Sequence, residues 1–305
     1  MRHRRRDSIT MKPIYIIALT LLGSLWGASF MFIRVASPVF GPFLLMFVRV
    51  LIAVLALLAY AAYLRQIPDL RAQWRQFLVL GALNSGLPFV LIAFSALTLT
   101  SSLTAILNST TPLFTALVAA VWIGERLTPR KIIGVLMGIV GVAILAGGSP
   151  LELTPAFVIA VLASLAAALC YGLGTVYASR ITGDLKGFQA AIGQLLGATV
   201  VLAVPAVATP APAPITLPAV AALIALALLS TSFAYLLYFY LLRHVGPTRT
   251  ATVTFLVPLF GTFWGVLLLG EALSIGLFIG MAVILASVSL VIGARKPKVP
   301  APNPS

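Results

Sequence analysis

Polar and aromatic side chains inside long apolar stretches are the residues of this sequence that could bind a ligand. A polar group in hydrocarbon costs free energy, so its presence marks a binding site or a contact between helices. One cation, several amides and hydroxyls and a set of aromatic rings are present, a mixture that holds a small solute. The candidate binding residues are Trp26, Phe30, Arg49, Asn84, Ser85, Asn108, Tyr171, Gln194, Tyr235 and Tyr238.

Some of these residues also fit purely structural roles. Asn84, Ser85 and Asn108 could equally bridge neighbouring helices by side-chain hydrogen bonds, which are common in membrane bundles. Arg49 could extend its guanidinium to the outer surface, or cap backbone carbonyls, instead of contacting a substrate. Both interpretations of these four residues stay open at the level of the sequence.

Residue groups that carry out catalysis are absent from the sequence. Both histidines, His3 and His244, fall at the ends of apolar stretches, and no pair of carboxylates lies in the middle of one. An enzyme inside the membrane needs a buried acid, base or metal ligands. The single Cys170 offers no disulfide and no metal-ligand spacing. We therefore predict that the protein is not an enzyme and has no cofactor or metal.

The composition indicates an all-α integral membrane protein. Hydrophobic residues make up 61% of the 305 residues and charged residues only 9%, against about 25% charged in soluble domains. Most apolar runs have the roughly 20 residues that a helix needs to cross a bilayer. The segments predicted to cross are 14–36, 42–64, 75–97, 101–123, 130–147, 154–179, 187–208, 217–242, 247–269 and 274–293.

Basic residues concentrate in alternate connectors, which accounts for the net charge of +14 without a nucleic-acid partner. They fall in the tails and after the even-numbered segments, whereas the opposite connectors hold Arg34 at a helix end and otherwise no Lys or Arg. The positive-inside rule then places both termini in the cytoplasm. We expect a monomer that binds a small-molecule substrate and anionic lipid on its basic side.

An internal repeat organises the chain. Pro112–Gly134 matches Pro258–Gly280 without a gap at a shift of 146 residues, so that Glu125 corresponds to Glu271. Each half then contains five crossing segments, and an odd number places the second half in the membrane with the opposite orientation. Such an inverted-topology repeat forms a binding site near the midplane, between the halves. The two glutamates lie at helix ends, where a structural turn or a salt bridge is favoured over proton transfer.

Weaker matches extend the repeat over the candidate residues. Trp26 and Tyr171 occupy corresponding positions, which favours cavity lining over simple packing, and Phe30 follows Trp26 by one helical turn on the same face. Arg49 corresponds to Gln194. The predicted organisation is a basic cytoplasmic tail (1–13), a first five-helix repeat (14–147), a linker (148–153), a second five-helix repeat (154–293) and a disordered cytoplasmic tail (294–305).

The chain resembles the EamA-type branch of the drug/metabolite transporter superfamily. The resemblance rests on SLWGASF in the first segment, a proline in the fourth, the GER-L and GEAL turns and the tandem pair of five-helix units. It covers nearly the whole chain. The resemblance implies a ten-helix inner-membrane carrier, often an exporter of amino acids or other small metabolites, and is nearly silent about the substrate.

The residues themselves favour a neutral or zwitterionic solute. A phosphorylated substrate needs more than one buried cation, and a cationic drug needs a carboxylate in the middle of the membrane. We therefore predict an alternating-access exporter of amino acids, apolar or aromatic ones above all. Because no acid or histidine falls within a crossing segment, we expect facilitated transport, although a sodium site built from backbone carbonyls stays open. The alternatives are a broad exporter of hydrophobic drugs, a proton-coupled antiporter, or a membrane scaffold that transports nothing.

Overall fold

The computed structural model describes residues 11–66, 70–149, 151–181 and 187–293, which form helices and turns with no strand among them. The predicted tail 294–305 and most of the predicted tail 1–13 lie outside the described residues. The elements are α1 Pro13–Phe40, α2 Pro42–Tyr63, η1 Arg71–Gln73, α3 Trp74–Gly81, η2 Ala82–Gly86, α4 Leu87–Ser95, α5 Ser101–Asn108, α6 Thr111–Ile123, α7 Pro129–Gly147, α8 Pro155–Ile181, α9 Gly187–Ala208, α10 Leu217–Ala227, η3 Leu228–Phe233, α11 Ala234–Val245, α12 Pro247–Thr250, α13 Val253–Leu269 and α14 Ile275–Ile292.

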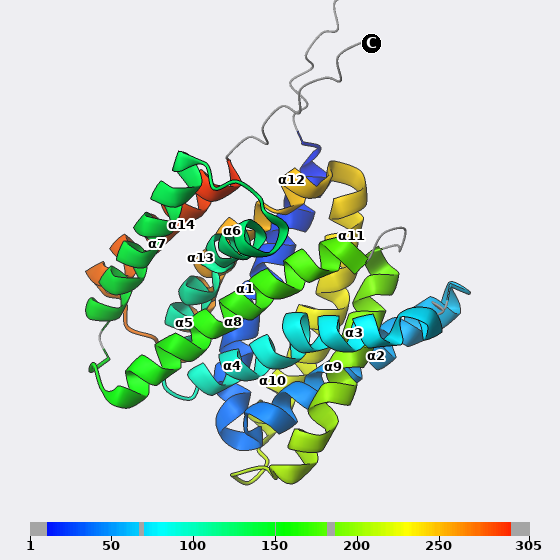
Figure 1. Ribbon diagram of the computed structural model, residues 1–305. Helices are drawn as coiled ribbons and strands as arrows, with labels where there is room; N and C mark the ends of the chain where they lie inside the picture. Colours follow the sequence, from blue (N-terminus) through cyan, green and yellow to red (C-terminus); the bar gives the residue numbers. More distant parts are fainter. Residues whose placement is uncertain (1–10, 67–69, 150, 182–186, 294–305) are drawn as a thin grey trace, which may run out of the picture.

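Nine helical runs in the described part of the chain are long and apolar enough to cross a membrane. Three of them are composite, because α3, η2 and α4 form one run, α5 and α6 another, and α10, η3 and α11 a third. A tenth apolar helix, α13, is shorter at 17 residues and follows the single turn of α12. The predicted all-α membrane fold is confirmed. Figure 1 shows that α1 begins and α14 ends at the same end of the bundle.

Two predicted segments differ from the structure more than the others do. The segment predicted over 247–269 is interrupted between α12 and α13, where Thr252 and Thr254 donate their hydroxyls to carbonyls three residues earlier, at 2.7 and 2.8 Å. Such bonds compete with the backbone hydrogen bonds of a helix. The first segment, predicted to end at residue 36, continues to Phe40 through Pro38. Arg34 therefore lies inside α1 rather than at its end.

Corresponding turns link α6 to α7 and α13 to α14. Gly124 and Gly270 end the preceding helices in the left-handed conformation, with φ of 67° and 64°, which glycine adopts without steric cost. Thr128 and Ser274 then cap the following helices, each accepting a hydrogen bond from the backbone N–H three residues on. The same local chemistry thus builds both turns, as the sequence repeat predicts.

The two π-helical turns, η2 and η3, also occupy corresponding positions, because Ala82 and Leu228 are 146 residues apart. A π-turn is one residue wider than an α-turn and is common at functional sites. In η3, the hydroxyls of Thr231 and Ser232 donate to carbonyls five residues earlier, at 2.8 and 3.0 Å. Each half therefore widens one helix in its interior, at a stretch of small polar residues.

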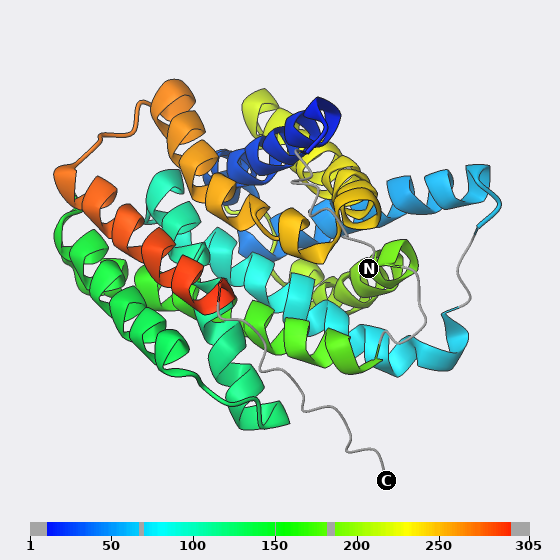
Figure 2. The same cartoon turned by 90° about the horizontal axis from the view of Figure 1, so that it is seen from above.

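Helices α7 and α14 pack along each other at one edge of the molecule, as Figure 2 shows. Small residues permit close approach of membrane helices, and a side chain at Gly134 would meet the Ser287 carbonyl and the Val291 side chain of α14. The other sides of both helices carry exposed apolar residues such as Leu136, Ile139 and Ile279. In a bilayer, that surface contacts lipid.

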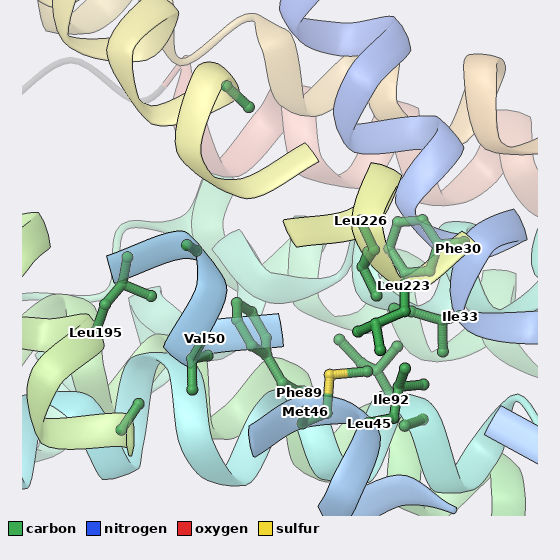
Figure 3. Packing of buried hydrophobic residues seen from close by; sticks show 14 of the residues in the cluster. Phe30, Ile33, Leu45, Met46, Val50, Phe89, Ile92, Leu195, Leu223 and Leu226 are labelled. Carbon is green, nitrogen blue, oxygen red and sulfur yellow. The ribbon is translucent and has the colours of Figure 1, made fainter. Parts of the chain in front are cut away.

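A large apolar cluster joins residues of both halves around the interior of the bundle. It includes Leu45 and Met46 from α2, Phe89 from α4, Leu195 from α9 and Leu226 from α10, all labelled in Figure 3. Close packing of this kind fixes the positions of the helices. The polar side chains that these helices carry are therefore held in place by the surrounding apolar contacts.

Candidate functional site

Arg49 is a buried cation between the two halves. Its side chain extends from α2 and the residue is only 5% exposed. The Nε atom donates a hydrogen bond to Thr231 Oγ1 of η3 at 3.0 Å, and Nη1 lies 3.7 Å from Met46 Sδ. The guanidinium carbon lies 3.8 Å from the ring centroid of Phe89 in α4, an arrangement in which the negative face of the ring stabilises the positive charge.

No carboxylate neutralises this charge within the described residues, where the one salt bridge joins Lys131 to Glu125. A buried charge is normally paired with an opposite charge, because the interior solvates ions poorly. The Thr231 hydroxyl accepts a hydrogen bond from Nε but carries no negative charge, so it is a weak substitute for a counter-ion. Arg49 is therefore positioned by a hydroxyl, a sulfur atom and a ring, while its charge lacks a counter-ion in the described structure.

Gln194 is the centre of a second polar group. It lies in α9 with 7% of its surface exposed. Its Nε2 donates to Ser85 Oγ at 2.7 Å and to the Tyr235 hydroxyl at 3.0 Å. Its Oε1 accepts a hydrogen bond from Asn84 Nδ2 at 2.8 Å. Both the nitrogen and the oxygen of this amide thus have partners within the protein, in contrast to the outer N–H groups of Arg49.

The two groups correspond to each other under the repeat. Arg49 corresponds to Gln194, and Thr231 corresponds to Ser85. In each case a long side chain from the second helix of one half reaches a hydroxyl in the π-turn of the other half. The two interactions connect α2 with η3 and α9 with η2, so the site is built from both halves. The chemical difference is that one half supplies a cation and the other a neutral amide.

Aromatic rings extend this polar centre. Trp26 of α1 lies 5.6 Å from Tyr238 of α11, and Phe239 connects Tyr238 to Tyr235 at centroid distances of 5.3 and 6.2 Å. On the other side, Tyr171 of α8 meets Phe89 edge-on at 6.4 Å. The phenols of Tyr171 and Tyr235 also lie close enough to the Arg49 guanidinium to interact with it electrostatically. The structure therefore brings eight of the ten predicted residues into one connected network.

No side-chain hydrogen bond or aromatic pair joins Phe30 or Asn108 to this network among the described residues. Phe30 is 4% exposed and belongs to the apolar cluster shown in Figure 3. Asn108 ends α5, and its Oδ1 atom is buried with no hydrogen-bond partner in the described structure. Neither observation tests substrate contact, so their part in binding stays a prediction.

Thr231, Phe89 and Phe239 belong to the network but are absent from the predicted set. Thr231 carried a usable signal, because it corresponds to the candidate Ser85 under the repeat. Phe89 and Phe239 carried none, since an aromatic residue in an apolar run is usually a packing residue. Their positions next to Arg49 and Tyr235 follow only from the packing of α4 and α11.

The equivalent glutamates have different partners in the structure. Glu271 accepts hydrogen bonds from the backbone N–H groups of Ser101 and Ser102, at 2.6 and 3.0 Å, and from the Ser102 hydroxyl. It thereby caps the first turn of α5, where free N–H groups and the helix dipole favour an anion. Glu125 instead forms the salt bridge that its basic neighbours predict, 2.7 Å from Lys131.

The sequence explains this difference. The residues that correspond to Thr100 and Ser101 are Gly246 and Pro247, which begin α12. Glycine has no hydroxyl to cap the helix, and proline has no backbone N–H for a carboxylate to accept from.

A pocket of about 280 Å³ lies between Glu125, Lys131 and residues 251 and 254. A second pocket, of about 390 Å³, lies along the outside of α1. Neither pocket is lined by any of the ten predicted site residues.

Similar proteins agree with a membrane transporter. A sequence model of the EamA-like transporter family matches residues 13–147 and, separately, residues 158–293. The uncharacterized transporter YvbV of Bacillus subtilis is 28% identical over 280 residues, which cover 90% of each chain. The uncharacterized inner membrane transporter YedA of Escherichia coli K12 is 28% identical over 285 residues, covering 90% of this chain and 89% of that one.

Two further comparisons extend over most of the chain. Protein PecM of Dickeya dadantii is 27% identical over 273 residues, 87% of this chain and 88% of its own. A protein of known crystal structure, 21% identical, superposes with a TM-score of 0.63 over 92% of this chain and 96% of that one. At that identity the likeness supports the fold alone. Because the family model matches both halves, the protein is a multi-pass membrane transporter rather than an enzyme, and it belongs to the EamA-like transporter family.

Proposed function

We propose that this transporter exports small zwitterionic or neutral metabolites, apolar and aromatic amino acids above all, and that they bind at the network around Arg49 and Gln194. The observation that carries the proposal is a single buried cation without a carboxylate partner, surrounded by amides, hydroxyls and aromatic rings. Such groups hydrogen-bond a small polar head and pack against an apolar body. The rings of Trp26, Tyr171 and Tyr238 suit that apolar body.

The charges of the site argue against two other substrate classes. A phosphorylated solute carries two negative charges and favours several cations, whereas the counterpart of Arg49 is the neutral Gln194. A cationic drug favours a buried carboxylate, but the acids of the described residues, Glu125, Glu152 and Glu271, lie at the ends of helices or between them. A neutral solute or a zwitterion matches the remaining chemistry.

The proposed mechanism is alternating access by two halves of opposite orientation. Its support is the 146-residue repeat, with five crossing segments in each half, and the pairing of corresponding residues across the site. Basic connectors place both termini in the cytoplasm under the positive-inside rule. Single cysteines at Gln66 and Glu152, in a Cys170→Ser background, test this orientation. We expect impermeant reagents to label residue 152 from outside the cell and residue 66 only after lysis; labelling of both from outside contradicts it.

We further propose facilitated transport by a monomer, driven by the gradient of the substrate. Proton-coupled carriers usually have an ionisable acid or histidine inside the membrane, and Arg49 is the one charged residue near the centre of the described network. Proteoliposomes loaded with unlabelled phenylalanine should accumulate labelled phenylalanine by counterflow, equally with and without a pH gradient. Empty liposomes and the lipid-facing variant Leu136→Ala are controls. Uptake that depends on the pH gradient and is lost in Glu125→Gln or Glu271→Gln refutes facilitated transport.

The same liposomes test the substrate class. We expect phenylalanine and leucine to compete for counterflow, and sugars and cationic dyes not to compete. Transport of a hydrophobic cationic dye without amino-acid transport supports a drug exporter instead. Flux of nucleotide sugars alone contradicts the proposed site, because such solutes carry more charge than one guanidinium compensates.

A further inference from the structure

We infer that Arg49 binds a carboxylate group of the substrate, and that the site therefore selects solutes with one carboxylate. This inference rests on the proposed function, because it names the chemical group that the substrate-binding network recognises. The structure supplies three independent arguments. They concern the partners that Arg49 lacks, the way in which its guanidinium is held, and the neutral residue at the corresponding position.

First, Arg49 does not behave like the structural arginines of the same chain. Arg34 donates to the Ala96 carbonyl and so ties α1 to the end of α4, and Arg180 donates to the Trp122 carbonyl at 3.3 Å. Arg49 donates to a hydroxyl and lies near a thioether sulfur, and no described backbone carbonyl accepts from it. Backbone capping, one of the alternatives open from sequence, is therefore not its role in this structure. Its 5% exposure equally excludes an extended path to the surface.

Second, the guanidinium is held in a fixed position with hydrogen-bonding capacity left over. The Phe89 ring covers it at 3.8 Å, and Thr231 fixes its Nε. A guanidinium has several N–H groups arranged as a fork that matches the two oxygens of a carboxylate. Nε and Nη1 have only weak acceptors, a hydroxyl oxygen and a thioether sulfur. The remaining N–H groups have no acceptor among the described residues. A carboxylate is the group that satisfies them and neutralises the charge at once.

Third, the corresponding position in the other half rules out a second site of the same kind. Gln194 is neutral, and its amide is already bonded to Asn84, Ser85 and Tyr235. Two positive charges would suit a dianion, whereas one cation and one neutral amide that is already bonded within the protein suit a monoanionic head. The phenols of Tyr171 and Tyr235, which lie near the guanidinium, then contact the remainder of the solute. An amino acid fits this arrangement, and so does a simple monocarboxylate.

A pair of molecules that differ only in charge tests the inference. 3-Phenylpropionate and its amide have the same ring, length and hydrogen-bonding oxygen, but only the acid is anionic. Binding to the purified protein is measured from the shift in thermal unfolding temperature at several concentrations of each compound. Because a hydrogen bond to a charged group is worth about 1.5–3 kcal/mol, we expect the acid to bind roughly 10- to 100-fold more tightly than the amide. Equal affinity of acid and amide for the wild-type protein overturns the inference, and this test requires no variant.

Variants at Arg49 locate the effect. Arg49→Gln copies the residue of the other half, and it should bind acid and amide equally. Arg49→Lys retains the charge without the fork, so it should keep a preference for the acid that is several-fold smaller than that of the wild type. Arg34→Gln is the control, since Arg34 is a part-buried cation outside the network, and it should leave the preference unchanged. If Arg49→Gln folds and still prefers the acid as strongly as the wild type does, Arg49 is not the carboxylate-binding residue.

Failure of this inference can be told apart from failure of the proposed function. If labelled phenylalanine is transported but acid and amide bind equally, the amino-acid exporter stands and the carboxylate contact of Arg49 is wrong. If the acid is preferred through Arg49 but no amino acid is transported, the site selects another class of monocarboxylate. The inference then holds, and the proposed amino-acid substrate is wrong.

Discussion

Replacing Glu271 by alanine is expected to destabilise the protein far more than the same change at its repeat equivalent, Glu125. Glu271 accepts three hydrogen bonds from the first turn of α5, and Thr100 caps the next N–H of that helix. Without the carboxylate, the N–H groups of Ser101 and Ser102 lose their acceptor. Charged hydrogen bonds are worth about 1.5–3 kcal/mol each in favourable cases, while removal of a helix cap costs about 0.5–2 kcal/mol. We therefore expect a loss of roughly 2–4 kcal/mol.

Glu125→Ala provides the matched control. Its one partner is Lys131, and the glutamate side chain is 46% exposed, so the pair contributes about 0–1 kcal/mol. Thermal unfolding in detergent, followed by tryptophan fluorescence, measures both variants. Because 1 kcal/mol shifts the midpoint by about 2–4 °C in chains of 150–250 residues, Glu271→Ala should lower it by several degrees and Glu125→Ala by about one. Equal shifts in the two variants, or none for Glu271→Ala, would refute the assignment of Glu271 as a helix cap.

Three other changes test the site and its surroundings. Gln194→Leu leaves Asn84, Ser85 and Tyr235 without their shared partner, and should cost about 2–4 kcal/mol of unfolding free energy, measured in the same thermal assay; an unchanged midpoint contradicts it. Phe89→Leu removes the ring from the Arg49 guanidinium, an interaction worth about 0.5–2 kcal/mol, so the free energy of unfolding should fall by at least about 0.5 kcal/mol in the same assay; an unchanged midpoint contradicts a stabilising contact. Gly197→Ala drives a methyl group into the Phe77 carbonyl of α3 and should destabilise by about 1–3 kcal/mol, whereas Gly147→Ala, which faces open space, should not.

The sequence could predict what depends on periodicity and composition. The apolar runs predict the helices, and the repeat, whose shift is 145 residues in this region, predicts that Arg49 and Gln194 occupy equivalent places. The repeat also pairs Ser85 with Thr231, so the hydroxyl that Arg49 contacts was within reach of sequence reasoning. The contact itself is not predictable from the sequence, because a threonine in an apolar helix usually bonds only to its own backbone.

Other features depend on contacts between distant segments. The interaction of Glu271 with α5 spans about 170 residues of sequence, and no local pattern identifies the helix end that a glutamate will cap. The π-turns arise from a change in backbone hydrogen bonding that small polar residues permit but do not require. The division between α12 and α13 likewise leaves the hydropathy profile unchanged, because the threonines there donate to nearby carbonyls within an otherwise apolar stretch.

The unequal partners of Glu271 and Glu125 bear on how quickly solute is taken up from each side of the membrane. In a carrier whose two shapes interconvert, each 1.4 kcal/mol of difference changes their population ratio about tenfold. Glu271 joins its turn to α5 by three hydrogen bonds, whereas Glu125 has an exposed ion pair beside a pocket. Under the proposed alternating access, this asymmetry is expected to favour one of the two shapes in the empty carrier, so that half-saturating concentrations differ between the two sides. Net flux in a passive carrier still follows the gradient, because a lower half-saturating concentration on one side is matched there by a lower maximal rate.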